Sequence, residues 1–475
     1  MDTSAKATVH LSIPVLIIRF FVLLYTYLTL PVYYAIQKPW RVVAGARRIR
    51  ALQEDPQDPY SSWARVGQLP DHYLDECRTL PEAQRRSLKE NGPESPCLGY
   101  RRISGEEDDR QPDGKVIKKW ELSDYQWLTA GEADTRISDI ARGLLMNGVK
   151  PKDTVLIFSE TRLEWLLSAQ AIARIGATIT TIYATLGTDG LIHGINEVDV
   201  THMITTEDLL PKLAKIHEHT PRVQTIIYIA LDYKHNPKVE FPSGVELVTF
   251  KQLEMDGAMA PKKLVGVEPT EDDVALIMYT SGSTGVPKGV VVTHKQIMAT
   301  FRSIRTLVHW EFANPAAHTY LAYLPLSHTL EFCAETYLFS CGVKIGYGTP
   351  YTLTNAGTAL KPGTKGDITL LRPTFMASVP LILDRIRRDI ELNVSKKGQF
   401  FKRFFDYVIQ YKMDWQRKGY RTPIIDRLVC NSIRSQIGGK LRVMMVGGAP
   451  LNPDTHQFLR ACLNIKLCQL IYHYT

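Results

Sequence analysis

The stretch Tyr279–Gly289, which reads YTSGSTGVPKG, decides how this chain of 475 residues is interpreted. It carries three glycines, four Ser or Thr hydroxyls and one lysine within eleven residues. Glycines let the backbone come close to oxyanions, and exposed N–H groups and hydroxyls can then donate hydrogen bonds to them. A lysine adds a mobile positive charge. The stretch therefore predicts a loop that holds phosphate groups.

The flanking residues predict where this loop lies. Val274–Tyr279 is an apolar run typical of a buried strand, and residues 296–304 fit a helix, so we expect the loop to leave a strand and enter a helix. Lys288 is followed by Gly289 rather than by Ser or Thr, and the chain has no GxGxxG stretch, which disfavours both common nucleotide-binding motifs. On composition alone, a surface turn rich in Gly, Ser and Thr remains the alternative.

The string resembles the phosphate-loop signature of the adenylate-forming (AMP-binding) enzymes, the superfamily of acyl-CoA synthetases, firefly luciferases and nonribosomal peptide synthetase adenylation domains. Three further segments resemble motifs of that family, in the family's order: YLPLSH at Tyr323–His328, RPTF at Arg372–Phe375 with Val379-Pro380, and VGGAPL at Val446–Leu451. They resemble its second core motif, its acyl-pocket segment and its adenine-binding turn.

Three other features narrow the resemblance to one group within the superfamily. YATLG at Tyr183–Gly187, ETRLEW at Glu160–Trp165 and the apolar N-terminus are most similar to the eukaryotic long-chain fatty acyl-CoA synthetases. The resemblance covers roughly residues 120–469. It implies a two-stage reaction with ATP, Mg²⁺ and CoA: a fatty carboxylate attacks the α-phosphate to form acyl-adenylate and pyrophosphate, and the CoA thiol then displaces AMP.

The resemblance also implies the site residues. Those expected to bind the nucleotide are Thr280, Ser281, Gly282, Ser283, Thr284, Gly285 and Lys288 for the phosphates, and Gly447, Gly448, Ala449 and Pro450 for adenine. Lys288, Thr284 and His328 are the expected catalytic residues, with His328 positioning the fatty acid carboxylate. Without the family, a histidine beside an apolar strand is more often a hydrogen-bonded core residue. No metal ligand is assigned.

The chain departs from the family's pattern at its end. After Gln469 the family continues with a glycine-tyrosine-glycine turn and a threonine-glutamate pair, whereas this chain reads LIYHYT. We therefore expect a chain truncated before the C-terminal domain, without the metal-binding glutamate, the ribose-binding aspartate or the lysine of that domain.

The expected function is a long-chain fatty acid–CoA ligase, an acid–thiol ligase, and whether this chain is active alone stays open. A non-catalytic membrane-anchored isoform that binds or regulates, and a ligase for another carboxylic acid, are the alternatives.

Helical and strand-like segments alternate along the chain, which predicts an α/β fold of layered, largely parallel sheets covered by helices. Expected helices cover residues 137–145 and 163–175, and expected strands cover 154–158, 177–184, 225–231, 274–279, 320–324 and 441–446. Residues 120–475 are assigned to the AMP-binding N-terminal domain, incomplete at its C-terminal end. Residues 37–119 are assigned to a juxtamembrane basic segment and a lead-in that is loop-rich from Leu52 to Gly114.

Residues 11–36 are almost wholly apolar and long enough to cross a hydrocarbon core of about 30 Å. We expect a transmembrane anchor there, after a short lumenal tail at 1–10; a cleaved signal peptide is the alternative. The basic residues that follow are Lys38, Arg41, Arg47, Arg48 and Arg50, and they predict a catalytic body in the cytosol. The endoplasmic reticulum is the expected membrane, with the lipid droplet and the mitochondrial outer membrane as alternatives.

Charge and cysteine content limit the partners. A formal charge of +8 is modest for 475 residues, which favours a membrane surface over nucleic acid. Seven cysteines without a CxxC pair indicate reduced thiols. The expected partners are a long-chain fatty acid, ATP, CoA and membrane lipid. Self-association, as pairing with the full-length enzyme, belongs to the regulatory alternative. The aromatic and basic stretch Arg385–Arg421 is a second candidate for lipid contact.

Overall fold

The computed structural model describes residues 13–49, 51–58, 60–67, 71–111, 114, 116–231, 239, 241, 244–280, 286–308 and 314–469. The chain divides into two compact units, each described by itself: unit 1 is Met1–Pro70 with Ser378–Thr475, and unit 2 is Asp71–Ala377.

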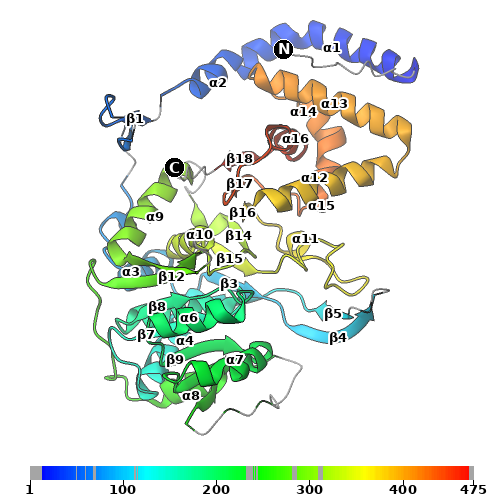
Figure 1. Cartoon of the computed structure of the whole chain (residues 1–475). Helices are drawn as coiled ribbons and strands as arrows, with labels where there is room; N and C mark the ends of the chain where they lie inside the picture. The colour runs from blue at the N-terminus through cyan, green and yellow to red at the C-terminus, as the bar shows by residue number, and fades with distance from the viewer. Residues whose placement is uncertain are drawn as a thin grey trace. The chain divides into compact units, whose positions relative to one another are not determined.

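Unit 2 contains a sheet with the strand order β11-β10-β9-β7-β8-β12-β13. Figure 1 labels its central strands β7, β8, β9 and β12. Its strands are β7 (Thr154–Phe158), β8 (Thr178–Thr181), β9 (His202–Thr206), β10 (Thr225–Ile229), β11 (Glu246–Thr249), β12 (Val274–Thr280) and β13 (Lys288–Thr293). All neighbouring pairs are parallel except β12–β13. The predicted parallel sheet is thus confirmed, with an antiparallel strand at one edge.

Helices cover this sheet, whose central strands β7, β8, β9 and β10 are buried on both faces. They are α4 (Ala130–Met146), α5 (Leu163–Arg174), α6 (Thr188–Glu197), α7 (Leu210–Ile216) and α8 (Phe250–Met259). Helices α6 and α7 share a buried core with Phe158 and Tyr279. Helices α4 and α8 approach each other closely at Gly257, where a Cβ atom would lie 1.8 Å from the Asp139 carbonyl oxygen.

A second set of strands in unit 2 has the order β16-β14-β15-β3-β6. They are β3 (Pro96–Tyr100), β6 (Gln126–Thr129), β14 (Thr319–Ala322), β15 (Lys344–Tyr347) and β16 (Phe375–Ser378). Only β3–β6 is antiparallel among these pairs. The remaining elements of unit 2 include the hairpin β4 (Ile103–Arg110) and β5 (Val116–Leu122), with α3 (Leu80–Asn91), α9 (His294–Val308), α10 (Thr329–Ser340) and α11 (Asp367–Leu371).

Unit 1 is mainly helical. Its helices are α1 (Ile13–Gln37), α2 (Pro39–Ala46), α12 (Pro380–Ser395), α13 (Gln399–Arg417), α14 (Pro423–Ile425), α15 (Asn431–Gln436) and α16 (Pro453–Leu463). Two strand pairs accompany them: β1 (Ala51–Gln53) with β2 (Trp63–Arg65), antiparallel, and β17 (Val443–Val446) with β18 (Lys466–Gln469), parallel. Among the described residues, Leu16–Gln37 is the one helical stretch whose length and composition would suit a membrane span.

The structure corrects two expectations. The chain after the phosphate loop enters strand β13 before it reaches helix α9, because the run Val290-Val291-Val292-Thr293 is β-branched and pairs with β12. The stretch from Leu52 to Gly114, expected to be loop-rich, contains α3, β3 and β4. Its charged residues are compatible with a strand because β4 pairs with the basic β5, as in the Lys119–Asp109 ion pair at 3.6 Å.

Candidate active site

Strands β12 and β13 form the base of the predicted phosphate loop. Thr280 ends β12, Lys288 begins β13, and the two residues are direct partners in the antiparallel pairing. Both are exposed to solvent. Ser281, Gly282, Ser283, Thr284 and Gly285 lie outside the described residues, so their phosphate contacts stay predictions. The pairing brings the first and last predicted phosphate ligands of this loop together.

Tyr279 ties the base of the loop to helix α6. Its side chain is buried, and its hydroxyl lies 2.7 Å from a carboxylate oxygen of Glu197 and 3.1 Å from the carbonyl oxygen of Gly194. Burial raises the pKa of Tyr279, and the Glu197 carboxylate raises this pKa further. The phenol therefore stays protonated at neutral pH and serves as a donor. From the sequence, Tyr279 was placed at the start of the phosphate-loop stretch and in a strand, and no role was assigned to its hydroxyl.

The YATLG segment lies beside the same loop. The Lys212 ammonium donates to the carbonyl oxygens of Ala184, at 3.1 Å, and Leu186, at 2.6 Å. A Cβ atom at Gly190, in the first turn of α6, would lie 3.1 Å from Cγ of Pro287, the residue before Lys288. The start of α6 therefore packs against the described end of the phosphate loop. Lys212 stands outside every quoted motif, so no sequence signal pointed to it.

Thr161 joins two other predicted segments, ETRLEW and YLPLSH. Its hydroxyl donates to the carbonyl oxygen of Leu324 at 2.6 Å and accepts from the N–H of Leu326 at 2.8 Å. Four residues further on, the fully buried ring of Trp165 lies 6.1 Å from that of Phe332 on α10. Thr161 follows the carboxyl end of a predicted parallel strand, which is where such sheets bind ligands. That position was the only sequence signal for the contact between Thr161 and YLPLSH.

His328 caps the N-terminus of helix α10. Its Nδ1 accepts the N–H of Leu330 at 3.2 Å, and the half-buried ring has a pKa lowered by burial. The imidazole is therefore neutral at neutral pH, with its proton on Nε2. An Nε2–H donor beside a helix N-terminus suits a carboxylate, because both features favour negative charge. This geometry is compatible with the predicted role of His328, which no contact here tests.

Two buried acids lie on α10 behind His328. The Tyr320 hydroxyl donates to Glu331 at 2.8 Å, and the Tyr347 hydroxyl donates to Glu335 at 2.6 Å. Burial raises the pKa of Glu331 well above its ordinary range and that of Glu335 to about 8. Both acids are therefore largely protonated at neutral pH. These tyrosines sit on β14 and β15, so the pairs also fix α10 to the strands that it covers.

The predicted acyl-pocket segment forms the start of β16. The Thr374 hydroxyl accepts the N–H of Thr319 at 2.9 Å, and the rings of Phe375 and Tyr320 lie 5.4 Å apart. Thr374 and Phe375 are buried. The segment thus lies next to β14, the strand that leads into YLPLSH. Its contact with an acyl chain stays a prediction.

The predicted adenine-binding turn belongs to unit 1 and connects β17 to α16. The Gly447 N–H donates to the carbonyl oxygen of Ser378 at 3.2 Å, and Gly448 has a φ of +82°, which favours glycine. Gly448, Ala449 and Pro450 are exposed. An exposed turn after a parallel strand is a suitable place for a planar base, and adenine contact stays a prediction for these residues.

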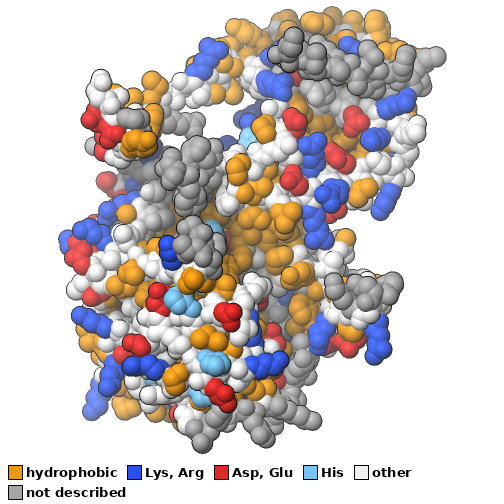
Figure 2. All heavy atoms as spheres, viewed as in Figure 1, with side chains coloured by type: hydrophobic (Ala, Val, Ile, Leu, Met, Phe, Trp, Pro, Cys, Tyr) orange, Lys and Arg blue, Asp and Glu red, His pale blue; other side chains and the backbone are white. Residues whose placement is uncertain are grey.

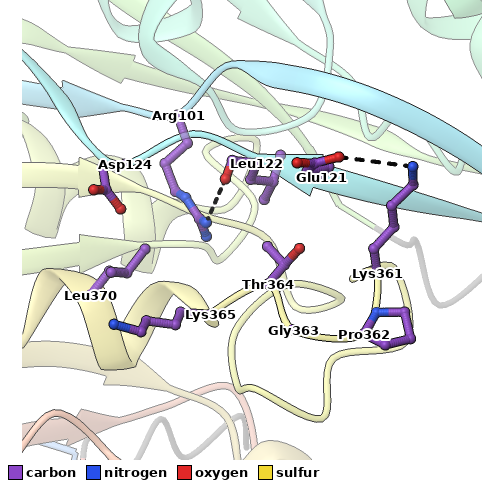
Figure 3. A pocket seen from close by; sticks show the side chains of 10 residues that line it. All are labelled: Arg101, Glu121, Leu122, Asp124, Lys361, Pro362, Gly363, Thr364, Lys365 and Leu370. Atoms are coloured by element: carbon purple, nitrogen blue, oxygen red, sulfur yellow. Dashed lines mark hydrogen bonds and ion pairs between the residues drawn. The ribbon is translucent and has the colours of Figure 1, made fainter.

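A polar cavity of about 450 Å³ lies elsewhere in unit 2, around the 361–365 loop and the end of β5 (Figure 3). Arg101 reaches into it, and its guanidinium pairs with Asp367 at 2.7 Å and donates to the backbone carbonyls of Leu122 and Ser123. Lys361 lies 3.9 Å from Glu121. None of the lining residues belongs to a quoted motif. These cations are engaged within the protein, so we assign no ligand to this cavity.

Within the described ranges, no cluster of three or more His, Cys, Asp or Glu residues could hold a metal ion. The same ranges contain all seven cysteines, each as a free thiol.

The comparisons with known proteins identify the family. The family model described as AMP-binding enzyme matches residues 106–474. The chain belongs to the AMP-binding enzyme family. The match confirms the resemblance found in the sequence.

Several relatives carry more specific names. Long chain acyl-CoA synthetase 8 of Arabidopsis thaliana is 36% identical over 412 residues, covering 86% of this chain and 57% of that protein. Long-chain-fatty-acid–CoA ligase 1 of Schizosaccharomyces pombe is 32% identical over 440 residues, covering 88% of this chain and 63% of that protein. The chain therefore spans about three-fifths of the length of these curated relatives.

Solved structures confirm the α/β fold class. The adenylation domain of a carboxylate reductase from Mycobacterium chelonae superposes with a TM-score of 0.63 at 19% identity, over 84% of this chain and 59% of that one. The N-terminal domain of FACL13 from Mycobacterium tuberculosis gives a TM-score of 0.54 at 17% identity, over 84% of this chain and 76% of that one. At such identities the likeness concerns the fold alone.

Proposed function

We propose that this protein takes part in long-chain fatty acid activation as an acid–thiol ligase that uses ATP, Mg²⁺ and CoA. The main support is the antiparallel pairing of β12 and β13 at the base of the phosphate loop, which places Lys288 opposite Thr280. The relatives of this chain are named long-chain acyl-CoA synthetases and long-chain-fatty-acid–CoA ligases. The substrate class rests on those names and on the YATLG and ETRLEW segments.

In this proposal a carboxylate oxygen of the fatty acid attacks the α-phosphorus of ATP, and pyrophosphate leaves. Negative charge on the phosphates is met by the Lys288 ammonium and by N–H and hydroxyl donors of the loop, including Thr284. The His328 Nε2–H holds the carboxylate in line with the phosphorus. In the second stage the CoA sulfur bonds to the acyl carbon, and AMP leaves. Mg²⁺ would supply further positive charge, and no described residue is assigned to hold it.

The test compares two lysine variants for palmitate-dependent pyrophosphate release and palmitoyl-CoA formation. Lys288→Ala should lower pyrophosphate release by about 100-fold or more, the usual scale for removing a group that stabilises transition-state charge. Lys295→Ala is the matched control, because Lys295 is an exposed lysine of α9 whose nearest carboxylate lies 3.9 Å away. Equal rates for the two variants would overturn the assignment of Lys288.

The same assays separate the alternatives. A parent chain that binds ATP but releases no pyrophosphate with palmitate would favour the binding or regulatory isoform, which acts through self-association with a complete enzyme. Pyrophosphate release with another carboxylic acid, but not with palmitate, would favour a different ligase.

The proposed location is a membrane surface, with the catalytic body on the cytosolic side. Support comes from the apolar helix α1 and from the basic residues that follow it. The endoplasmic reticulum is the proposed compartment, and the lipid droplet and the mitochondrial outer membrane are its alternatives. Subcellular fractionation of the native protein tests this choice.

A further inference from the structure

Helix α1 has two different sides. Its threonines and its glutamine, Thr26, Thr29 and Gln37, recur at helical spacing on one side, and all three are buried or half-buried. The exposed large apolar or aromatic residues of α1 are Leu16, Ile17, Phe20, Phe21, Leu23, Leu24, Tyr25, Tyr27, Leu28, Val32, Tyr34 and Ile36. The helix thus turns its hydrogen-bonding side toward protein and leaves apolar side chains uncovered (Figure 2).

The partner of the polar side is helix α13, also in unit 1 (Figure 1). The hydroxyl oxygens of Thr26 and Tyr411 lie 2.6 Å apart. Further along, the Gln37 amide accepts from the N–H of Arg421 at 2.6 Å and donates to its carbonyl oxygen at 3.1 Å. Helix α1 therefore contacts α13 near its middle, and its end contacts the chain just after α13.

The residues just after each of the two helices also lie close together. Gly419, at a φ of +87°, lies so near Pro39 that a Cβ atom would be 2.6 Å from the Pro39 carbonyl oxygen. Contacts at Thr26, Gln37 and Pro39 fix the direction of α1 relative to α13.

Helix α13 is unsuited to the interior of a bilayer. Its exposed positions include Lys402, Arg403 and Arg417, and the buried ammonium of Lys412 pairs with Asp426. If α1 crossed a membrane while docked in this way, α13 would enter the hydrocarbon beside it and take these charges along. Charges at that depth are costly and rare in membrane proteins. The docked arrangement therefore disfavours a crossing orientation.

The chain just after α1 has the chemistry of a membrane surface. Lys38, Arg41, Arg47 and Arg48 are exposed, and basic residues beside an apolar helix attract anionic lipid headgroups. Trp40, also exposed, packs against Tyr34 with ring centroids 4.6 Å apart. Aromatic rings of this kind prefer the headgroup level of a bilayer.

We propose that α1, docked on α13, lies in the plane of an anionic membrane with its apolar side among the outer acyl chains. Both ends of α1 then lie on the same side of the bilayer. This arrangement differs from the single-pass anchor expected from the sequence. It does not depend on ligase activity, so its failure would leave the proposed reaction untouched.

The test measures the depth of three positions in the full-length protein bound to phosphatidylcholine–phosphatidylserine vesicles. Ile17, Leu24 and Leu28 lie on the side of α1 opposite Thr26 and are exposed. Each is replaced by cysteine, labelled with a nitroxide and measured against lipid-soluble and water-soluble relaxants. The parent protein, treated with the same label, corrects for the native thiols.

An in-plane helix predicts equal depths for the three labels, about 5–10 Å below the headgroup boundary. A crossing helix predicts a difference of about 16 Å between the labels at Ile17 and Leu28, because eleven residues separate them along the axis. Such a difference would overturn the proposal, and so would a failure to bind these vesicles.

Matched variants test whether docking holds the helix in the plane. The double change Thr26→Val with Gln37→Leu removes the Thr26–Tyr411 bond to α13 and the two Gln37 bonds to Arg421 in the chain after α13, and we expect the label depths at Ile17 and Leu28 to diverge. Thr29→Val is the control, because the Thr29 hydroxyl bonds only backbone carbonyls of α1. Equal depths in the double variant would overturn the role of docking.

Discussion

Replacing Thr161 with valine should weaken the contact between the segments ETRLEW and YLPLSH. Valine has nearly the same shape as threonine, so the change removes a hydroxyl without opening a cavity. Two hydrogen bonds disappear, one to the Leu324 carbonyl and one from the Leu326 N–H, and both leucines are buried. Each bond contributes about 0.5–1.5 kcal/mol net, and an unpaired buried group costs about 1–3 kcal/mol. We expect unit 2 to lose about 2–3 kcal/mol of unfolding free energy.

The assay is urea unfolding followed by intrinsic fluorescence, with two reference variants. Thr161→Ser keeps the hydroxyl and should retain most of the lost stability. Thr135→Val, at an exposed threonine whose hydroxyl donates only within α4, should change stability by less than about 0.5 kcal/mol.

Thr161→Val should also weaken binding of the fatty acid at the proposed site around His328. Leu326 lies two residues before His328, so loss of its bond to Thr161 frees the backbone that leads to the α10 N-terminus. We expect the KM for fatty acid in pyrophosphate release to rise about tenfold, the equivalent of 1.4 kcal/mol. Equal stabilities of Thr161→Val and Thr135→Val would refute the energetic argument. An unchanged KM in a destabilised Thr161→Val would refute the link to His328.

Two further predictions concern unit 2. Tyr279→Phe removes the hydroxyl that joins β12 to α6, and we expect a loss of about 1 kcal/mol in unfolding free energy together with weaker ATP binding, measured by titration calorimetry. Burial lowers the pKa of His294 to about 4, while an unfolded histidine titrates near 6.5. Its contribution to stability is therefore complete above pH 6.5 and is lost as the pH falls toward 4, by about 2 kcal/mol at pH 5. Urea unfolding at pH 7.5 and pH 5 measures this difference in unfolding free energy.

Each of these predictions has a control. Tyr228→Phe, at a half-buried tyrosine of β10, should leave ATP affinity unchanged; an equal loss of affinity in both tyrosine variants would contradict the role of the Tyr279 hydroxyl. His294→Asn should reduce the pH dependence by about 2 kcal/mol, whereas His193→Asn, at a histidine whose side chain is 39% exposed, should not. Identical pH dependence in the parent and in His294→Asn would contradict the assignment.

The sequence predicted those elements whose apolar residues follow a simple rule. Strand β7 is a continuous apolar run because both of its faces are buried, and helix α4 shows its buried residues at a spacing of three and four. Strand β13 was missed because it begins with Lys288 and Gly289 and because two of its valines, Val290 and Val291, are exposed. Helix α3 was missed because its sequence is largely polar, although Thr79 before Leu80-Pro81 was a readable helix start.

The site was predictable only where it follows a motif. The phosphate-loop signature and YLPLSH predict Lys288 and His328 by resemblance to a family, and the roles of both residues stay predictions. The residues that hold these motifs in place, Thr161, Lys212 and Tyr279, act through contacts between segments far apart in the chain. Such contacts leave no periodicity in a single sequence, because they depend on how elements pack and not on local spacing.

The electrostatics around His328 follow from burial more than from the identity of its neighbours. One histidine and two glutamates lie within eight positions of the chain, and burial moves the pKa of His328 down and those of Glu331 and Glu335 up. All three are therefore mostly uncharged at neutral pH, so an approaching carboxylate meets a hydrogen-bond donor without repulsion from acids behind it. In the proposed reaction, positive charge for the phosphates comes from Lys288, at the base of the predicted phosphate loop. Under the proposed function, the neutral His328 donor suits the carboxylate and the exposed Lys288 cation suits the phosphates, which are the two groups that react.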